Sequence, residues 1–425
     1  MDSPYQPGFG ARPAVLVGRD RQLAKARAAL TRVANTRAAA PSALVFTGAR
    51  GLGKTVTLDV IAEQARDRGF VTAGVALDGV SDNVQLLAAR VAEGLKDLEH
   101  ARFRTAWERV RDRLAALSIE IDAGVVKVSS PPPRTAPTQS ATRREALAAL
   151  LTDGAHLAAE HEHTGLAIFV DEFQEAPTAD LVVIANAIQD ALMAADAPLA
   201  VFAAGLPETP DRVMAAASFT ERFDFRTLER LDEDSAERAL VEPALALDVH
   251  WAAPAASTVL TAAAGSPYLI QRLGDETWTL ASPRPGDTIG EDAAQRAVAD
   301  VRESLGNGMF RGRWAKATAA ERDLMVAIAQ VVDVDGVAQT RGITFVTGRT
   351  TPQLSPARQS LIDKGLVESV AHGRLRFTMP GFAEFVRDHV GVPWFGPSAG
   401  APGGELPGPG NREHPELPSG PTPEA

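Results

Sequence analysis

The stretch GARGLGKT, residues 48–55, directly follows an apolar run at residues 43–47 and opens a segment with a helical pattern. Two glycines, a lysine and a hydroxyl at this spacing predict a phosphate-binding loop. The glycines let the backbone curl so that successive N–H groups face one anion, and the helix adds the positive end of its dipole. We expect Lys54 to reach the β- and γ-phosphates of a nucleoside triphosphate and Thr55 to ligate Mg²⁺.

A second apolar run, residues 166–170, ends in two carboxylates, Asp171 and Glu172. Burying either carboxylate would be costly, so we expect both at the carboxyl edge of a sheet. Asp171 would then hold Mg²⁺ through water, and Glu172 would act as the general base that orients and polarises the attacking water. Two interpretations of Gln174 stay open: contact with the γ-phosphate or the water, and a plain exposed glutamine.

The fourth predicted strand, residues 199–204, ends at Ala204 and Gly205. Many ATPases with a similar phosphate-binding loop carry a polar residue at this place that senses the γ-phosphate. No such residue is present. The sequence therefore predicts slow ATP hydrolysis, or compensation by Gln174.

The composition is that of a soluble, folded protein of 425 residues, with 45% hydrophobic and 23% charged residues. The absence of cysteine excludes disulfides, thiolate zinc sites and a cysteine nucleophile. The sequence shows no apolar run long enough for a bilayer and no secretory signal pattern, so we expect a cytoplasmic protein without membrane contact. A net charge of −11 means that any nucleic-acid contact must use a local face.

Strands alternate with helices in the first half of the chain, which predicts an α/β fold with a parallel sheet covered on both faces. The five predicted strands are residues 43–47, 71–77, 166–170, 199–204 and 223–228. We predict five parts: a flexible N-terminus (1–13), a nucleotide-binding α/β domain (14–230), a helical lid (231–305), a winged-helix domain (306–391) and a disordered Pro/Gly-rich tail (392–425).

The winged-helix prediction depends on the order helix, helix, hairpin near the end of the chain. The elements are a helix at 317–331 with a Thr318–Glu321 capping box, a helix at 355–364, and strands at 366–370 and 374–378. Such a domain can place its second helix in the DNA major groove. The candidate DNA contacts are Arg349, Arg358, Lys364, Arg374 and Arg376. A protein-binding or autoinhibitory role is the alternative, because the charges of this part are nearly balanced.

With these motifs, the chain resembles the AAA+ P-loop ATPases, in particular the origin-recognition-like, archaeal-type and signal-transducing STAND groups. The resemblance rests on VGRDRQL (17–23), the two motifs above, ERFDF (221–225) and GSPY (265–268). It implies a central-strand-insertion sheet, active sites between subunits and a nucleotide-dependent homo-oligomer. It also implies adenine-side contacts by Gly18, Arg19 and Pro267, and nucleotide contacts along the loop by Gly48, Arg50, Gly51, Leu52, Gly53, Lys54, Thr55 and Val56.

Two arginines are candidate contacts under this resemblance. Arg222 would be an arginine finger that acts in trans, or a surface arginine paired with Glu221 or Asp224. Arg272 would be a second sensor on the lid, or a solvated helix residue.

The leading hypothesis is an ATP-hydrolysing molecular switch that uses ATP and Mg²⁺, with Glu172, Lys54 and Arg222 as its catalytic residues. Two alternatives stay open: a DNA-binding initiator-like ATPase, and a STAND-like signalling or defence ATPase whose C-terminal domain binds a protein. The partner, DNA or protein, is not determined by the sequence.

Overall fold

The structure is a computed structural model that describes residues 1–8, 10–98, 104–122, 125–128, 137–161, 163–194, 196–217 and 221–397. Its main sheet has five strands in the order β2-β5-β6-β1-β7, and every neighbouring pair is parallel. The strands are β1 (Leu44–Thr47), β2 (Phe70–Ala76), β5 (Gly165–Asp171), β6 (Leu199–Gly205) and β7 (Asp224–Thr227). Strand β6 is inserted between β1, which precedes the glycine-rich loop, and β5, which ends in the acidic pair, as the predicted central-strand insertion requires, and the predicted α/β class is confirmed.

The central strands are buried because their sequences are almost continuously apolar, as expected for a sheet covered on both faces. All residues of β1 and β6 are buried, and β5 is buried up to Val170. Phe169 and Phe202 stack across β5 and β6 with ring centroids 5.3 Å apart. The polar ends of these strands therefore lie at one edge of the sheet.

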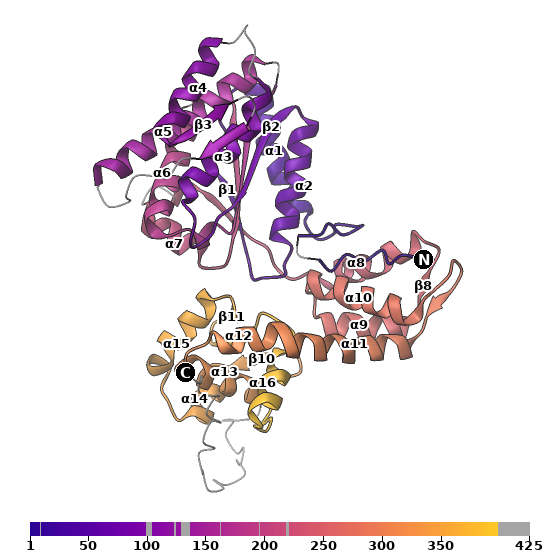
Figure 1. Cartoon of the computed structure of the whole chain (residues 1–425). Coiled ribbons are helices and arrows are strands. Elements are labelled where there is room, and N and C mark those ends of the chain that lie inside the picture. Colours follow the sequence, from indigo (N-terminus) through magenta and orange to yellow (C-terminus); the bar gives the residue numbers. More distant parts are fainter. Residues whose placement is uncertain are drawn as a thin grey trace, which may run out of the picture.

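Seven helices of the described residues belong to this α/β unit. They are α1 (Asp20–Thr36), α2 (Lys54–Asp67), α3 (Asn83–Leu95), α4 (Arg104–Ala116), α5 (Pro137–Glu160), α6 (Thr178–Met193) and α7 (Thr209–Ala216), with short 3-10 turns at Lys96–Leu98 and Phe173–Glu175. Figure 1 shows α1 and α2 on one face of the sheet and α3, α5 and α6 on the other. Among the helices that the structure describes, none has the length and hydropathy needed to cross a lipid bilayer.

A small antiparallel hairpin, β3 (Ile119–Asp122) and β4 (Val125–Val128), follows α4 and was not predicted. Its strands are four residues each, too short for a clear alternation of apolar and polar residues. The N-terminal cap of α3 is Asp82, whose side chain accepts a hydrogen bond from the Gln85 N–H at 3.0 Å.

A four-helix lid follows the sheet. It contains α8 (Glu233–Leu245), α9 (Ala253–Ala263), α10 (Pro267–Ala281) and α11 (Glu291–Leu305), with a two-residue pairing of β8 (His250–Trp251) and β9 (Thr288–Ile289). Asp232 caps α8 and Ser266 caps α10, each by accepting a backbone N–H of its first turn. Pro267 directly follows Ser266 and is the first residue of α10. The N–H at this position has no acceptor within the helix, so proline loses no hydrogen bond there.

The N-terminal segment, expected to be flexible, lies against this lid, where Figure 1 places the chain start. Tyr5 is 2% exposed and its hydroxyl donates to the Leu240 carbonyl at 2.5 Å. Trp251 Nε1–H donates to the same hydroxyl at 2.9 Å. A side chain at Gly274 would meet the Tyr5 ring at 2.7 Å, so this glycine makes room for the tyrosine. The difference from expectation arises because one buried aromatic residue can anchor a Pro/Gly-rich segment.

The C-terminal unit follows a π-turn (Gly306–Phe310) and the short helix α12 (Arg311–Ala315). Its elements are α13 (Ala319–Val331), β10 (Val337–Gln339), α14 (Thr340–Thr347), α15 (Thr351–Asp363), β11 (Val367–Ala371), β12 (Arg374–Phe377) and α16 (Phe382–Val390). The predicted capping box and hairpin are present, whereas β10 and α14 were not predicted. Of the predicted disordered tail, residues 398–425 lie outside the described residues, but Trp394 Nε1–H donates to the Val332 carbonyl at 2.8 Å.

Arg230 joins the three units. Its guanidinium donates to the Ala264 carbonyl of the lid at 2.9 Å, and to the carbonyls of Phe377 and Thr378 in the C-terminal unit at 3.1 and 2.9 Å. It also lies 3.4 Å from Glu368. One apolar core occupies the α/β unit up to Leu228, and a second is shared by the lid and the C-terminal unit. The lid and the C-terminal unit are therefore packed together beneath the edge of the sheet (Figure 1).

Candidate functional site

The GARGLGKT loop connects β1 to α2 and lines a cavity of about 1070 Å³. Gly51 and Gly53 have φ angles of 86° and 80°, which other residues rarely adopt. Gly53 is the N-cap residue of α2, directly before Lys54, and no side chain caps that helix. The first-turn N–H groups of α2 therefore face the cavity without a side-chain acceptor, the arrangement that binds anions at helix N-termini.

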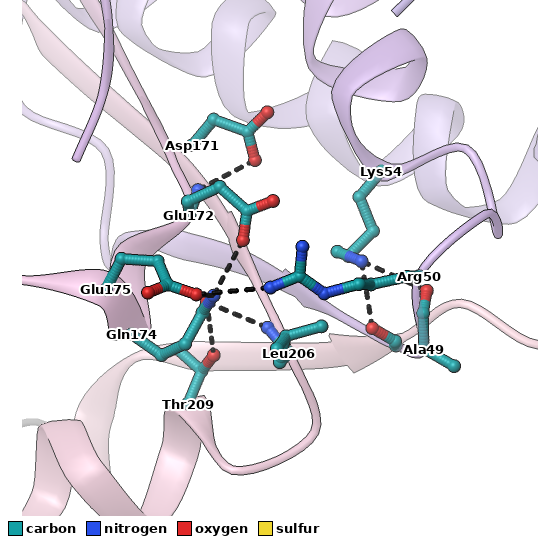
Figure 2. Close-up of polar contacts among 10 residues, drawn as sticks. Ala49, Arg50, Lys54, Asp171, Glu172, Gln174, Glu175, Leu206 and Thr209 are labelled. Atoms are coloured by element: carbon teal, nitrogen blue, oxygen red, sulfur yellow. Dashed lines mark hydrogen bonds and ion pairs between the residues drawn. The ribbon is translucent and has the colours of Figure 1, made fainter. Parts of the chain in front are cut away.

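Lys54 is buried, 7% exposed, at the start of α2. Its Nζ donates to two carbonyls of its own loop, those of Gly48 at 2.9 Å and Ala49 at 3.0 Å (Figure 2). Burial lowers the pKa of Lys54, and the nearby carboxylates of Glu172 and Asp171 act in the opposite direction. A buried ammonium held only by neutral carbonyls is a strong site for an anion.

Asp171 and Glu172 lie at the end of β5, opposite the loop. The Thr55 hydroxyl donates to Asp171 Oδ2 at 2.6 Å, so the two groups predicted to hold the metal are already in contact. Hydroxyl and carboxylate oxygens are ligands that Mg²⁺ prefers, so the residues present fit this ion. Glu172 has a φ of 48°, a strained value for a residue with a side chain, and it lines the cavity. Strain of this kind is common at functional sites.

Gln174 is not an exposed glutamine: it is 1% exposed and lies between Glu172 and the end of β6 (Figure 2). Its Nε2–H donates to Glu172 Oε2 at 2.6 Å, and its Oε1 accepts from the Leu206 N–H at 2.9 Å. Thr209 lies beside it, with Oγ1 at 3.3 Å from Gln174 Oε1. A side chain at Gly205 would meet Gln174 Oε1 at 2.5 Å. Gln174 therefore occupies the space beside Gly205, at the end of β6 that lacks a polar residue.

The other end of the cavity is apolar and suits a base. It is lined by residues from the N-terminal segment, the entry motif and the lid: Gly8, Gly10, Val15, Leu16, Val17, Leu231, Ala239 and Pro267. The amide groups of Gln6 and Gln271 also lie there, and the Gln6 N–H donates to Gln271 Oε1 at 2.9 Å. The contribution of residues 1–13 was missed by the sequence analysis, because it depends on the burial of Tyr5 against the lid.

The other predicted site residues differ in whether they line the cavity. Gly18 and Gly48 do not line it, but each lies where a side chain would clash with its surroundings. A side chain at Gly48 would meet the Leu228 carbonyl at 2.7 Å, and one at Gly18 would meet the Leu231 side chain at 2.7 Å. Arg19 lines the cavity but is 4% exposed and donates to the carbonyls of Gly18, Leu52 and Glu229 at 2.8, 2.9 and 3.0 Å. Burial lowers its pKa. Leu52 and Val56, predicted nucleotide contacts, line the cavity.

The two candidate arginines lie outside the cavity. Arg272 lies 3.6 Å from Glu276, one helical turn along α10, and its neighbours Tyr268 and Gln271 line the cavity instead. Arg222 is exposed, and Asp224 is paired with Lys25 and Arg226 rather than with Arg222. Within the described part of this chain, neither arginine reaches the phosphate-binding loop.

The C-terminal unit also lines the cavity, in addition to the loop and the lid. The sequence did not indicate that this unit contributes to the cavity. Gln359 and Asp363 of α15, Lys364, Leu366 and Met379 line it, as do Met309, Gly312, Arg313 and Lys316 of the junction. Glu208, after β6, also lines it and has a buried carboxylate oxygen that finds no hydrogen-bond partner among the residues that the structure describes. Burial raises the pKa of Glu208 to about 7. These residues carry no motif, so only their proximity identifies them.

Two sequence families match the chain. Residues 15–202 match the family described as "AAA ATPase domain", and residues 307–386 match "Domain of unknown function (DUF8462)". No curated protein matches the sequence.

Solved structures of similar architecture include the ORC2 protein of Aeropyrum pernix, determined in ADPNP–ADP complexes. It is 14% identical, with a TM-score of 0.53 over 91% of this chain and 97% of its own. The Walker-type ATPase paby2304 of Pyrococcus abyssi is 12% identical, with a TM-score of 0.53 over 88% of this chain and 97% of its own. At these identities the similarity concerns the fold.

Proposed function

We propose that the chain binds ATP with Mg²⁺ in this cavity, hydrolyses it, and transmits the nucleotide state to its C-terminal unit. The match of residues 15–202 to the AAA ATPase domain family supports this proposal. One observation carries the proposal: Lys54, Thr55 and Glu172 line a single cavity that the C-terminal unit also lines, and Asp171 accepts a hydrogen bond from Thr55. The cavity has a basic end at the loop, which suits the phosphates of ATP, and an apolar end at the lid, which suits its base.

The residues have separate roles in the proposed hydrolysis. Lys54 exchanges its loop carbonyls for the phosphate oxygens, which gives a stronger, charge-assisted interaction. Glu172 accepts a proton from a water whose oxygen attacks the γ-phosphorus, while the bond from that phosphorus to the bridging oxygen breaks and ADP leaves. Thr55 and Asp171 would hold Mg²⁺, which when bound neutralises charge on the phosphates.

Coupling to the C-terminal unit follows from the shared walls of the cavity. Lid residues Pro267 and Tyr268 and C-terminal residues Asp363 and Lys364 face the same space as the loop. A ligand that contacts all three parts stabilises one relative arrangement over others, and its loss on hydrolysis releases that bias. The chain would therefore act as a nucleotide-dependent switch.

We propose a protein as the partner of the C-terminal unit. Lys364 pairs with Glu321 at 2.8 Å, Arg376 with Glu368 at 2.8 Å and Arg349 with Asp323 at 3.2 Å, so three of the five predicted DNA contacts have acidic neighbours. A cation neutralised by a carboxylate contributes less to the counterion release that drives DNA binding. Retention on duplex DNA that falls steeply with salt would instead favour the initiator-like alternative.

Two variants test nucleotide binding and turnover separately. For Lys54→Ala we expect loss of the thermal stabilisation that ATP·Mg²⁺ gives the wild type, about 2.7 kcal/mol at 100 times Kd. For Glu172→Gln we expect ATP affinity within about twofold of wild type and turnover reduced by about 10²-fold or more, because the amide cannot accept the proton. Arg66→Ala, an exposed change on the same helix, is the matched control.

The outcomes are distinguishable. Unchanged ATP stabilisation in Lys54→Ala would refute the binding site, and normal turnover in Glu172→Gln would remove that residue from the mechanism. Turnover per chain that rises with protein concentration, and is lost in Arg222→Ala, would support a homo-oligomer with Arg222 acting in trans.

A further inference from the structure

The junction between the lid and the C-terminal unit forms part of the wall of the nucleotide cavity. This junction consists of the π-turn at Gly306–Phe310 and helix α12, Arg311–Ala315. Three of its residues, Met309, Gly312 and Arg313, line the cavity, and so does Lys316, which directly follows α12. π-turns are rare and are frequently found at functional sites.

Arg313 differs from the other cations of the cavity. Arg19, Lys54 and Arg212 donate to backbone carbonyls, Arg50 pairs with Glu175 and Lys364 with Glu321. The Arg313 guanidinium is half-buried, and no hydrogen bond or ion pair is found for it among the residues that the structure describes. Lys316 also lines the cavity but is exposed. Burial, and then the positive charge of Arg50, lower the pKa of Arg313 to about 10.

The position of Arg50 indicates which ligand atom Arg313 faces. Arg50 belongs to the phosphate-binding loop and its guanidinium extends toward Glu175, 3.2 Å away, on the Glu172 side of the loop (Figure 2). Glu172 is the proposed base, so this is the side on which the terminal phosphate of ATP would lie. Arg313 lines the same cavity as Arg50 but, unlike Arg50, has no carboxylate partner among the residues that the structure describes. A bound anion would supply that partner.

We propose that Arg313 contacts the terminal phosphate of ATP from within the same chain. This inference rests on the proposed function, and it assigns to the junction a role that Arg272 and Arg222, both outside the cavity, do not fill. Arg313 is five residues before Thr318, the N-cap of α13. The presence of the terminal phosphate is thereby read by the segment that carries the C-terminal unit, and its loss on hydrolysis frees that segment.

The test compares a non-hydrolysable ATP analogue with ADP, both with Mg²⁺, by equilibrium titration with the full chain. For Arg313→Ala we expect affinity for the analogue to fall about tenfold or more, as for loss of a charge-assisted hydrogen bond, and affinity for ADP to stay within about twofold. Arg313→Lys keeps the charge without the planar fork, so we expect an intermediate loss. Arg311→Ala, an exposed change on the same helix, is the matched control.

A second measurement tests the link to the C-terminal unit. We expect the analogue, but not ADP, to slow amide hydrogen exchange at residues 306–318 in the wild type, and expect this protection to be lost in Arg313→Ala. Equal loss of analogue and ADP affinity, or no loss of either, would overturn the assignment while leaving the ATP site intact. If the wild type bound neither nucleotide, the proposed function itself would fail. Should Arg313→Ala not fold, the same comparison is made with Arg313→Lys.

Discussion

Gln174 offers the sharpest test of how the site is organised. Its side-chain amide joins two functional features, the carboxylate of Glu172 and the end of β6, through contacts of 2.6 Å and 2.9 Å. Gln174→Met keeps the length and approximate volume of the side chain and removes every one of these hydrogen bonds. Gln174→Glu keeps the acceptor for the Leu206 N–H but places a second carboxylate beside Glu172.

The magnitudes follow from the groups left behind. The Leu206 N–H belongs to a residue that is 3% exposed, so loss of its acceptor should cost about 1–3 kcal/mol of unfolding free energy. The charged carboxylate of Glu172 loses the short hydrogen bond that the Gln174 amide donates to it. Such a bond is worth about 1.5–3 kcal/mol, which corresponds to roughly 10- to 100-fold in turnover if it positions the base.

The assay measures three quantities for each variant: the ATP dissociation constant, steady-state phosphate release and the denaturant midpoint. For Gln174→Met we expect lower turnover and lower stability. We expect ATP affinity within about threefold of wild type, because the hydrogen-bond partners of Gln174 among the described residues, which are Glu172, Glu175, Leu206 and Thr209, all lie outside the phosphate-binding loop. For Gln174→Glu we expect stability closer to wild type but turnover at least as low. Thr209→Val, which removes only the 3.3 Å contact, is the control and should change stability by under about 1 kcal/mol.

The reasoning would be refuted by a Gln174→Met protein with wild-type turnover and an unchanged midpoint. Reduced ATP affinity with normal turnover at saturation would place Gln174 in substrate binding rather than in positioning the base.

Two further predictions concern the walls of the cavity. Tyr5→Phe removes a hydroxyl that donates to Leu240 and accepts from Trp251, so we expect a loss of about 1–3 kcal/mol in unfolding free energy and weaker ATP binding; an unchanged denaturant midpoint would contradict the anchoring role. Because burial raises the pKa of Glu208 to about 7, above its ordinary value of 4.5, folding favours the protonated form, and the associated stability is present below pH 4.5 and lost as pH rises through 7. Melting temperatures from pH 5 to 8 should therefore decline more steeply for the wild type than for Glu208→Gln, and parallel curves would count against this.

The nucleotide site illustrates what local sequence can determine. The loop glycines, Lys54 and Thr55 are close in sequence, and the strand before them dictates where the loop emerges, so their chemistry can be predicted without a structure. Asp171 and Glu172 could be predicted for the same reason, since a buried strand must place its polar end at the sheet edge. The predicted strand positions and the capping box of α13 depend on equally local patterns and are confirmed.

Gln174 marks the limit of that reasoning. The sequence left it open between a functional contact and an exposed glutamine. Its burial depends on Gly205, a residue on another strand whose missing side chain provides the space. The end of β6 lacks a polar side chain at Gly205, and Gln174 occupies the space that such a side chain would need. The missing polar residue and the burial of Gln174 therefore belong to the same packing arrangement.

By itself, the sequence determined the α/β class, the glycine-rich loop between β1 and α2, the acidic strand end, and helices α13 and α15 and the β11–β12 hairpin of the C-terminal unit, because each depends on neighbours within a few residues. Only the tertiary structure decided that Tyr5 is buried in the lid, that Arg230 joins three units and that Arg313 and Glu208 face the nucleotide cavity. These features arise from contacts between segments far apart in the sequence, such as Tyr5 and Trp251, which are 246 residues apart, and no periodicity or spacing encodes such contacts.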